Sequence, residues 1–123
     1  MTLISNRFRA GITLVTTALL CAAVIAPSSA HADAVAYLVN VTVRPGYNFA
    51  NADDALRYGQ GICDKVAQGA PYGAMIGDIK ADFTTSDDYQ ASYLISQAVN
   101  ELCPALIWQL RNSAVHYRAP EAP

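Results

Sequence analysis

Histidine, cysteine and tryptophan are scarce in this chain of 123 residues, which contains two, three and one of them, respectively. His31 lies ahead of an expected cleavage site, so His116 near the C-terminus is the histidine expected in the mature protein. A nucleophilic triad needs a histidine beside a serine or cysteine and a carboxylate that orients it. The acidic pairs Asp53–Asp54 and Asp87–Asp88 lack the alternating spacing of a calcium loop. We therefore expect no catalytic residue, no metal site, no cofactor and no enzyme activity.

Positive charge is also scarce, and it is not clustered. Without Arg7 and Arg9 of the N-terminal region, six basic residues stand against ten acidic ones, which gives a formal charge of −4. Proteins that bind nucleic acid or anionic membrane surfaces need clustered lysine and arginine. The sequence therefore argues against nucleic acid as a partner.

Long apolar runs are missing except near the N-terminus. Residues 10–26 are mostly apolar, follow two arginines and precede the small-x-small triplet Ala30-His31-Ala32. This order is typical of a secretory signal peptide, and the run is shorter than the roughly 20 residues of a membrane span. We predict a signal peptide over 1–32 and a mature protein that begins at Asp33. It would be secreted to the extracellular space or cell envelope, with no transmembrane segment after cleavage.

The cysteines that remain after cleavage form a single pair, Cys63 and Cys103, because Cys21 lies within the predicted signal peptide. Two cysteines in an oxidising compartment favour a disulfide bond. Redox-active pairs are close in sequence, whereas these cysteines are 40 residues apart, so we expect a structural role. Closing a loop of this length contributes about 4 kcal/mol in the chain-entropy model. That is comparable to the whole net stability of so small a domain.

The remaining pattern is helical. Apolar residues recur at three- and four-residue steps over residues 53–68, 72–83 and 86–102, and a further apolar face runs from Pro104 to Tyr117. The sequence predicts an all-α domain over 33–117, a small bundle of four to five short helices stapled by the disulfide. The bond would hold the first and third of these helices side by side, with the second packed across them. Residues 118–123 have nothing to bury and should form a disordered tail.

Helix boundaries and glycines add detail to this expectation. Asn51 is a suitable N-cap for the helix over 53–68, and Gly69 is a suitable stop after it. Thr85 with Asp88 has the chemistry of a capping box. Gly59 and Gly61 each cost about 1 kcal/mol relative to alanine inside a helix. Such a cost is easiest to accept where another backbone packs closely against the helix.

Residues 35–43 (VAYLVNVTV) support two interpretations. Valine and tyrosine alternate with other residues, and β-branched side chains dominate, which favours a strand. The same residues also fit a short helix, and the sequence contains no second strand that could pair with a first one. Because an isolated strand leaves its backbone groups unsatisfied, we favour a helix.

All seven tyrosines lie in the predicted mature chain, which is many for a domain of this size. Tyrosine suits positions that are apolar at one end and wet at the other. The tyrosines could therefore edge a small core, or form a surface for a partner or apolar ligand. Tyr117 and His116 are residue types that can ligate haem, but no other feature of the sequence indicates haem binding. The residues that we expect on a ligand or partner surface are Tyr58, Tyr72, Tyr89, Tyr93 and Trp108.

Several short segments together resemble a known family. They are Tyr37-Leu38-Val39, Gly61-Ile62-Cys63 and the run from Ala98 to Pro104, in which the second cysteine is followed directly by proline. The pattern resembles the domain of unknown function 732 family, small secreted proteins of mycobacteria and their relatives, over about residues 35–104. The resemblance implies an exported, disulfide-linked, all-helical domain and no particular activity. The tyrosine content and the segment after Pro104, which carries Trp108, depart from the family pattern.

We therefore expect a secreted, non-enzymatic binding or interaction module of unknown biochemical role. Its partner would be a protein or a component of the cell envelope. The alternative is a carrier of a small apolar ligand, such as a lipid or haem.

Overall fold

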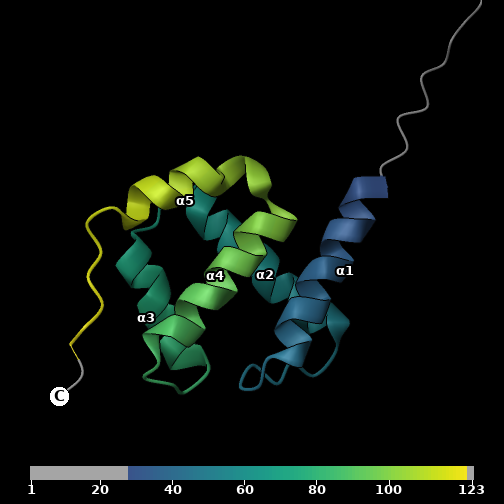
Figure 1. Cartoon of the computed structure of the whole chain (residues 1–123), viewed down its shortest axis with the longest axis horizontal. Helices are drawn as coiled ribbons and strands as arrows, with labels where there is room; N and C mark the ends of the chain where they lie inside the picture. The colour runs from purple at the N-terminus through teal and green to yellow at the C-terminus, as the bar shows by residue number, and fades with distance from the viewer. Residues whose placement is uncertain (1–27, 122–123) are drawn as a thin grey trace, which may run out of the picture.

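The computed structural model describes residues 28–121, in which all regular structure is helical (Figure 1). The expected all-α fold is thus confirmed. The helices are α1 (Ser28–Val43), α2 (Ala52–Ala67), α3 (Tyr72–Asp82), α4 (Asp88–Leu102), the short 3₁₀ helix η1 (Pro104–Leu106) and α5 (Ile107–Ala114). Most of the predicted signal peptide lies outside the described residues. The α1 backbone continues across the predicted cleavage site between Ala32 and Asp33.

Residues 35–43, which fit either a strand or a helix, form the second half of α1. Tyr37 and Val41, one turn apart, are buried in the core. The valines on the other side of the helix are 58, 52 and 74% exposed; they are Val35, Val39 and Val43. The alternation in the sequence is therefore a product of i, i+4 spacing on two opposite helix faces.

The limits of α2 follow the predicted signals. The Asn51 side chain accepts a hydrogen bond from the Asp54 backbone N–H at 2.8 Å, as expected of an N-cap. After the helix, Gly69 has a φ of +79°, a left-handed conformation that glycine adopts at little steric cost. The chain thereby turns back into α3.

The start of α4 differs from the predicted capping box. The cap is Asp87, whose carboxylate accepts from the Tyr89 N–H at 2.9 Å, while the Thr85 hydroxyl accepts from the Asp87 N–H. Asp88 does not reach back to the helix start. Its carboxylate instead accepts hydrogen bonds from Lys80 and Tyr117, two groups far apart in sequence that local pattern could not reveal.

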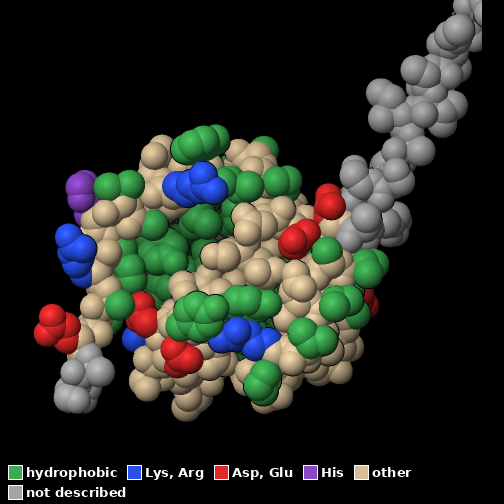
Figure 2. Space-filling view, viewed as in Figure 1, with side chains coloured by type: hydrophobic (Ala, Val, Ile, Leu, Met, Phe, Trp, Pro, Cys, Tyr) green, Lys and Arg blue, Asp and Glu red, His purple; other side chains and the backbone are tan. Residues whose placement is uncertain are grey.

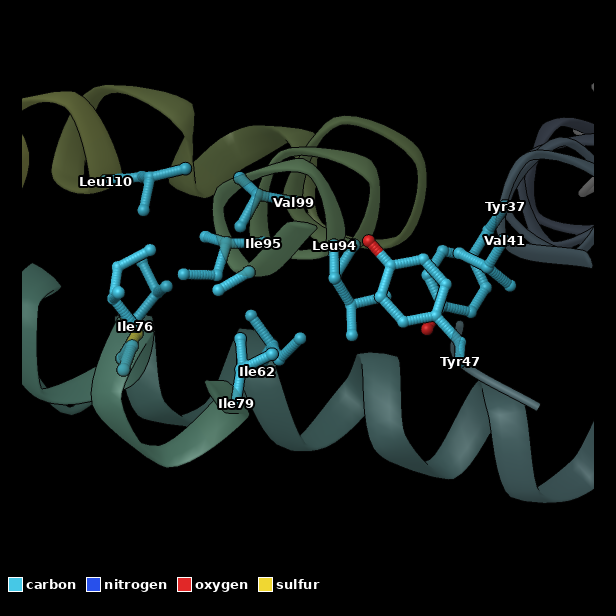
Figure 3. Close-up of a cluster of buried hydrophobic side chains, with 14 of the residues drawn as sticks. Tyr37, Val41, Tyr47, Ile62, Ile76, Ile79, Leu94, Ile95, Val99 and Leu110 are labelled. Atoms are coloured by element: carbon cyan, nitrogen blue, oxygen red, sulfur yellow. The ribbon is translucent and has the colours of Figure 1, made fainter. Parts of the chain in front are cut away.

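The core is organised around α4, which packs against α1, α2, α3 and α5. In Figure 3, Leu94, Ile95 and Val99 of α4 point toward Ile62 of α2 and Ile79 of α3. Tyr37 and Val41 of α1 close one end of this cluster, and Ile76 and Leu110 lie at the other. Burial of large aliphatic side chains at about 1.5–3 kcal/mol each is the main favourable term in a domain of this size.

A disulfide joins Cys63 of α2 to Cys103 at the end of α4, as the sequence predicts. The bond holds these two helices side by side. The expected position of α3 is partly wrong, because α3 packs against α4 and α5 and makes no more than slight backbone contact with α2. Side chains rather than close backbone packing span the space between α2 and α3.

The C-terminal part forms two short helices, η1 and α5, and Pro104 stands at the first position of η1. Tyr117 then fastens the chain to the bundle: its hydroxyl donates to Asp88 Oδ2 at 2.6 Å, and its ring packs edge-on against Tyr72. The described residues beyond Tyr117, up to Glu121, form no helix. The last two residues of the predicted tail lie outside the described part.

Candidate functional site

The separation of α2 from α3 leaves a surface hollow of about 420 Å³, which we call the α2–α3 hollow. Residues of α2, residues of α3 and Phe49 line it. The two helices run antiparallel, because Lys65 late in α2 meets Asp78 in the middle of α3, and Tyr58 earlier in α2 meets Asp82 at the end of α3. The hollow therefore follows the length of both helices.

The floor of the α2–α3 hollow is apolar. Ile62, Met75 and Ile79 form it, and all three belong to the hydrophobic core with exposures of 4% or less. Phe49 and Tyr58 line the end at which α2 begins, where their ring centroids are 5.7 Å apart. An apolar group that entered the hollow would thus contact the core itself.

Two polar bridges cross between α2 and α3. Lys65 Nζ lies 2.9 Å from Asp78 Oδ2 at one end, and the Tyr58 hydroxyl donates to Asp82 Oδ2 at 2.7 Å at the other. Burial, together with the hydrogen bond to the Asp82 carboxylate, raises the pKa of the Tyr58 phenol, so this group remains a donor at neutral pH. The Lys65 pair is half exposed, so it contributes little to stability.

Gly61 lies between these bridges on α2 and leaves the mouth of the hollow open. A Cβ placed there would meet no atom within 4 Å. Gly59, two residues earlier, differs, since a Cβ there would lie 2.6 Å from Leu102 Cδ1 and 2.7 Å from Tyr37 Cζ. The close approach expected at these glycines thus exists at Gly59, where side chains rather than a backbone make it, and is absent at Gly61.

Charges line the rim unevenly. Arg57 Nη1 pairs with Asp54 Oδ1 at 2.9 Å on the exposed side of α2, toward the Phe49 end. Asp82 lines the same end. Lys65 is the charged group that lines the opposite end. The hollow therefore has two carboxylates and one guanidinium at one end, and an ammonium group that pairs with Asp78 at the other.

A second hollow, of about 410 Å³, lies between α1, the 44–51 segment and the start of α2. Leu38, Val41 and Ala55 supply apolar lining, and Phe49 lines this hollow as well as the α2–α3 hollow. Phe49 is thus a wall shared by two hollows. Its neighbour Asn48 has a φ of +49°, a conformation that residues other than glycine rarely adopt.

The structure separates the five residues predicted for a binding surface. Tyr58 lines the α2–α3 hollow, Tyr72 packs against Tyr117, and Trp108 is 71% exposed on α5. Tyr89 and Tyr93 lie on α4, with the Arg44 guanidinium 4.8 and 4.3 Å from their ring centroids. Figure 2 shows the face on which α1 and α4 lie in front, with hydrophobic side chains over both helices and basic side chains among them. These residues do not form one continuous site.

The sequence did not identify most of the residues that line the α2–α3 hollow. Phe49, Ile62, Met75 and Ile79 have the composition of ordinary core residues, so nothing in their identity distinguishes them. Besides Tyr58, Gly61 gave a signal, as a glycine inside a helix where alanine would be more stable.

Within residues 28–121, no three histidine, cysteine or acidic side chains are grouped so that they could hold a metal ion. The Tyr117 hydroxyl donates to Asp88. His116, which precedes Tyr117 in the sequence, is exposed. The helices of this part of the chain are also too short or too polar to cross a membrane.

The fold and the disulfide define a class, the small helical domains closed by one bond between distant helices. The sequence matches a family model described as "Protein of unknown function (DUF732)" over residues 30–105, more than half of the chain. The chain therefore belongs to the DUF732 family, as its motifs indicate. The matched region contains both cysteines and every residue that lines the α2–α3 hollow, whereas α5 lies outside it. No curated protein and no solved structure matches the chain.

Proposed function

We propose that this protein is exported and acts as a non-enzymatic binding module, with the α2–α3 hollow as its binding site. The observation that carries the proposal is an apolar hollow of about 420 Å³ whose floor is the hydrophobic core and whose rim is charged. Small-molecule sites in proteins have volumes of about 300–1,000 Å³ and combine an apolar lining with a few polar groups. The disulfide supports export, because such bonds persist in oxidising compartments.

The occupant of the hollow would be an apolar group. It could belong to a free small molecule, or to a protein or component of the cell envelope. Extraction of the purified protein, followed by mass spectrometry and a visible absorption scan, distinguishes these cases. A lipid in the mass spectrum or a haem absorption band would favour a carrier. If no small molecule is extracted from the purified protein, an interaction module is favoured.

The direct test uses the neutral apolar dye N-phenyl-1-naphthylamine, whose fluorescence rises in apolar surroundings. Gly61→Leu should fill the mouth of the hollow and weaken dye binding at least about tenfold, a loss of about 1.4 kcal/mol. Gly77→Leu is the matched control, since Gly77 is also a helical glycine with no atom within 4 Å of a Cβ placed there, but does not line the hollow. Equal dye binding by both variants would contradict the proposed site.

A further inference from the structure

The shape of the α2–α3 hollow restricts what it can hold. On α2 its lining extends from Asp54 to Lys65, a distance of about 16 Å at 1.5 Å per residue. A volume of about 420 Å³ spread over this length describes an elongated hollow. An extended alkyl chain suits this shape. The hollow is therefore better suited to an extended chain than to a compact molecule.

The charges at the two ends give such a chain a direction. At the Phe49 end, the carboxylates of Asp54 and Asp82 and the Arg57 guanidinium line the rim, which leaves a formal charge of −1 that disfavours an anionic head group. At the other end the Lys65 ammonium lines the hollow. An ammonium group has three donors, and one of them is directed to Asp78. The other two remain for a ligand.

From this arrangement we infer that the α2–α3 hollow takes a long-chain carboxylate. The carboxylate accepts hydrogen bonds from Lys65, the chain passes Gly61 over the floor at Ile62, and its far end meets Phe49. The inference rests on the proposed function, and it adds the ligand class and the orientation. The exposed pair with Asp78 is weak, so a ligand carboxylate can share or displace that partner.

The test compares dodecanoate with dodecyltrimethylammonium, which carries a head group of opposite charge on a chain of the same kind. Each competes with N-phenyl-1-naphthylamine for the oxidised protein, below the concentration at which micelles form. Dodecanoate should displace the dye at a concentration about tenfold lower, as one charge-assisted hydrogen bond implies. Equal competition by the two compounds would overturn the inference.

Variants locate the head group. Lys65→Gln should abolish the preference for dodecanoate over dodecyltrimethylammonium, which is measured as the ratio of the two competing concentrations within that variant. Asp78→Asn should strengthen dodecanoate binding, since it removes the competing carboxylate. Arg111→Gln is the charge-matched control on α5, outside the hollow, and should retain the preference.

Two results would count against the inference in different ways. A preference for dodecanoate that persists in Lys65→Gln would overturn the assignment of the head group while the binding site itself stands. Failure of the oxidised wild-type protein to bind the neutral dye would overturn the proposed function and this inference together.

Discussion

Substitution of Gly59 by alanine tests how α1 is held against the rest of the bundle. The Cβ of the alanine would lie 2.7 Å from Cζ and 2.8 Å from the hydroxyl oxygen of Tyr37, distances that real Cβ contacts do not show. Tyr37 has no exposed surface, and its hydroxyl donates to the Ala55 carbonyl at 3.0 Å. The ring therefore has no free space into which it can move. Leu102, the other close neighbour, can shift its side-chain end more easily.

The expected magnitude follows from two opposing effects. Alanine in place of glycine should stabilise a helix by about 1 kcal/mol. Overpacking of a filled core costs about 1–3 kcal/mol, and displacement of the buried Tyr37 hydroxyl costs about 1–3 kcal/mol more. We therefore expect Gly59→Ala to lower the free energy of unfolding by about 1–5 kcal/mol, whereas Gly61→Ala should raise it by up to about 1 kcal/mol.

Urea denaturation of the oxidised variants, monitored by circular dichroism, measures the free energy of unfolding of each variant. The pair is well matched, because the two glycines lie on the same helix two residues apart. Opposite signs are the expected result. If Gly59→Ala were as stable as Gly61→Ala, the packing of Tyr37 over α2 described here would be wrong.

Three further predictions concern stability. Replacement of Cys63 and Cys103 by serine should cost up to about 4 kcal/mol in urea denaturation, and mass spectrometry of the native protein should show two hydrogens fewer than the reduced formula; quantitative reaction with a maleimide would refute the bond. Asp88→Asn should cost about 1–2 kcal/mol, because the carboxylate accepts hydrogen bonds from Lys80 and Tyr117 that a neutral amide makes less strongly; unchanged urea denaturation would argue against this anchor. Burial raises the pKa of Tyr47 to about 12, so the folded state favours the neutral phenol. The free energy of unfolding should be constant below the unfolded pKa of about 10 and fall as the pH rises from about 10 to about 12. A free energy of unfolding that does not change over this pH range would contradict the burial of Tyr47.

The sequence predicted the helices well, because their apolar faces repeat at helical spacing and their ends carry local signals such as Asn51 and Gly69. Residues 35–43 were ambiguous for a physical reason. A valine or tyrosine at every second position also places residues four apart on one helix face, and the neighbours in the fold decide between the two structures. The capping residue of α4 was misassigned because Asp88 interacts with Lys80 and Tyr117, which come from other parts of the chain.

The candidate site was much less predictable than the fold. The α2–α3 hollow exists because both helices pack on α4 and hardly on each other. No local pattern encodes that separation. Of the five residues expected on a binding surface, only Tyr58 lines this hollow. Gly59 and Gly61 look alike in sequence, yet one lies beneath a buried ring and the other beneath open space.

The central claim is that the α2–α3 hollow binds an apolar chain. The most direct measurement is a nuclear magnetic resonance titration of the isotopically labelled, oxidised protein with dodecanoate. Chemical-shift changes should concentrate along α2 and α3, with Gly61, Ile62 and Ile79 among the residues most affected. Saturable binding whose shift changes lie instead on the exposed valine face of α1, or no saturable change at all, would contradict the claim.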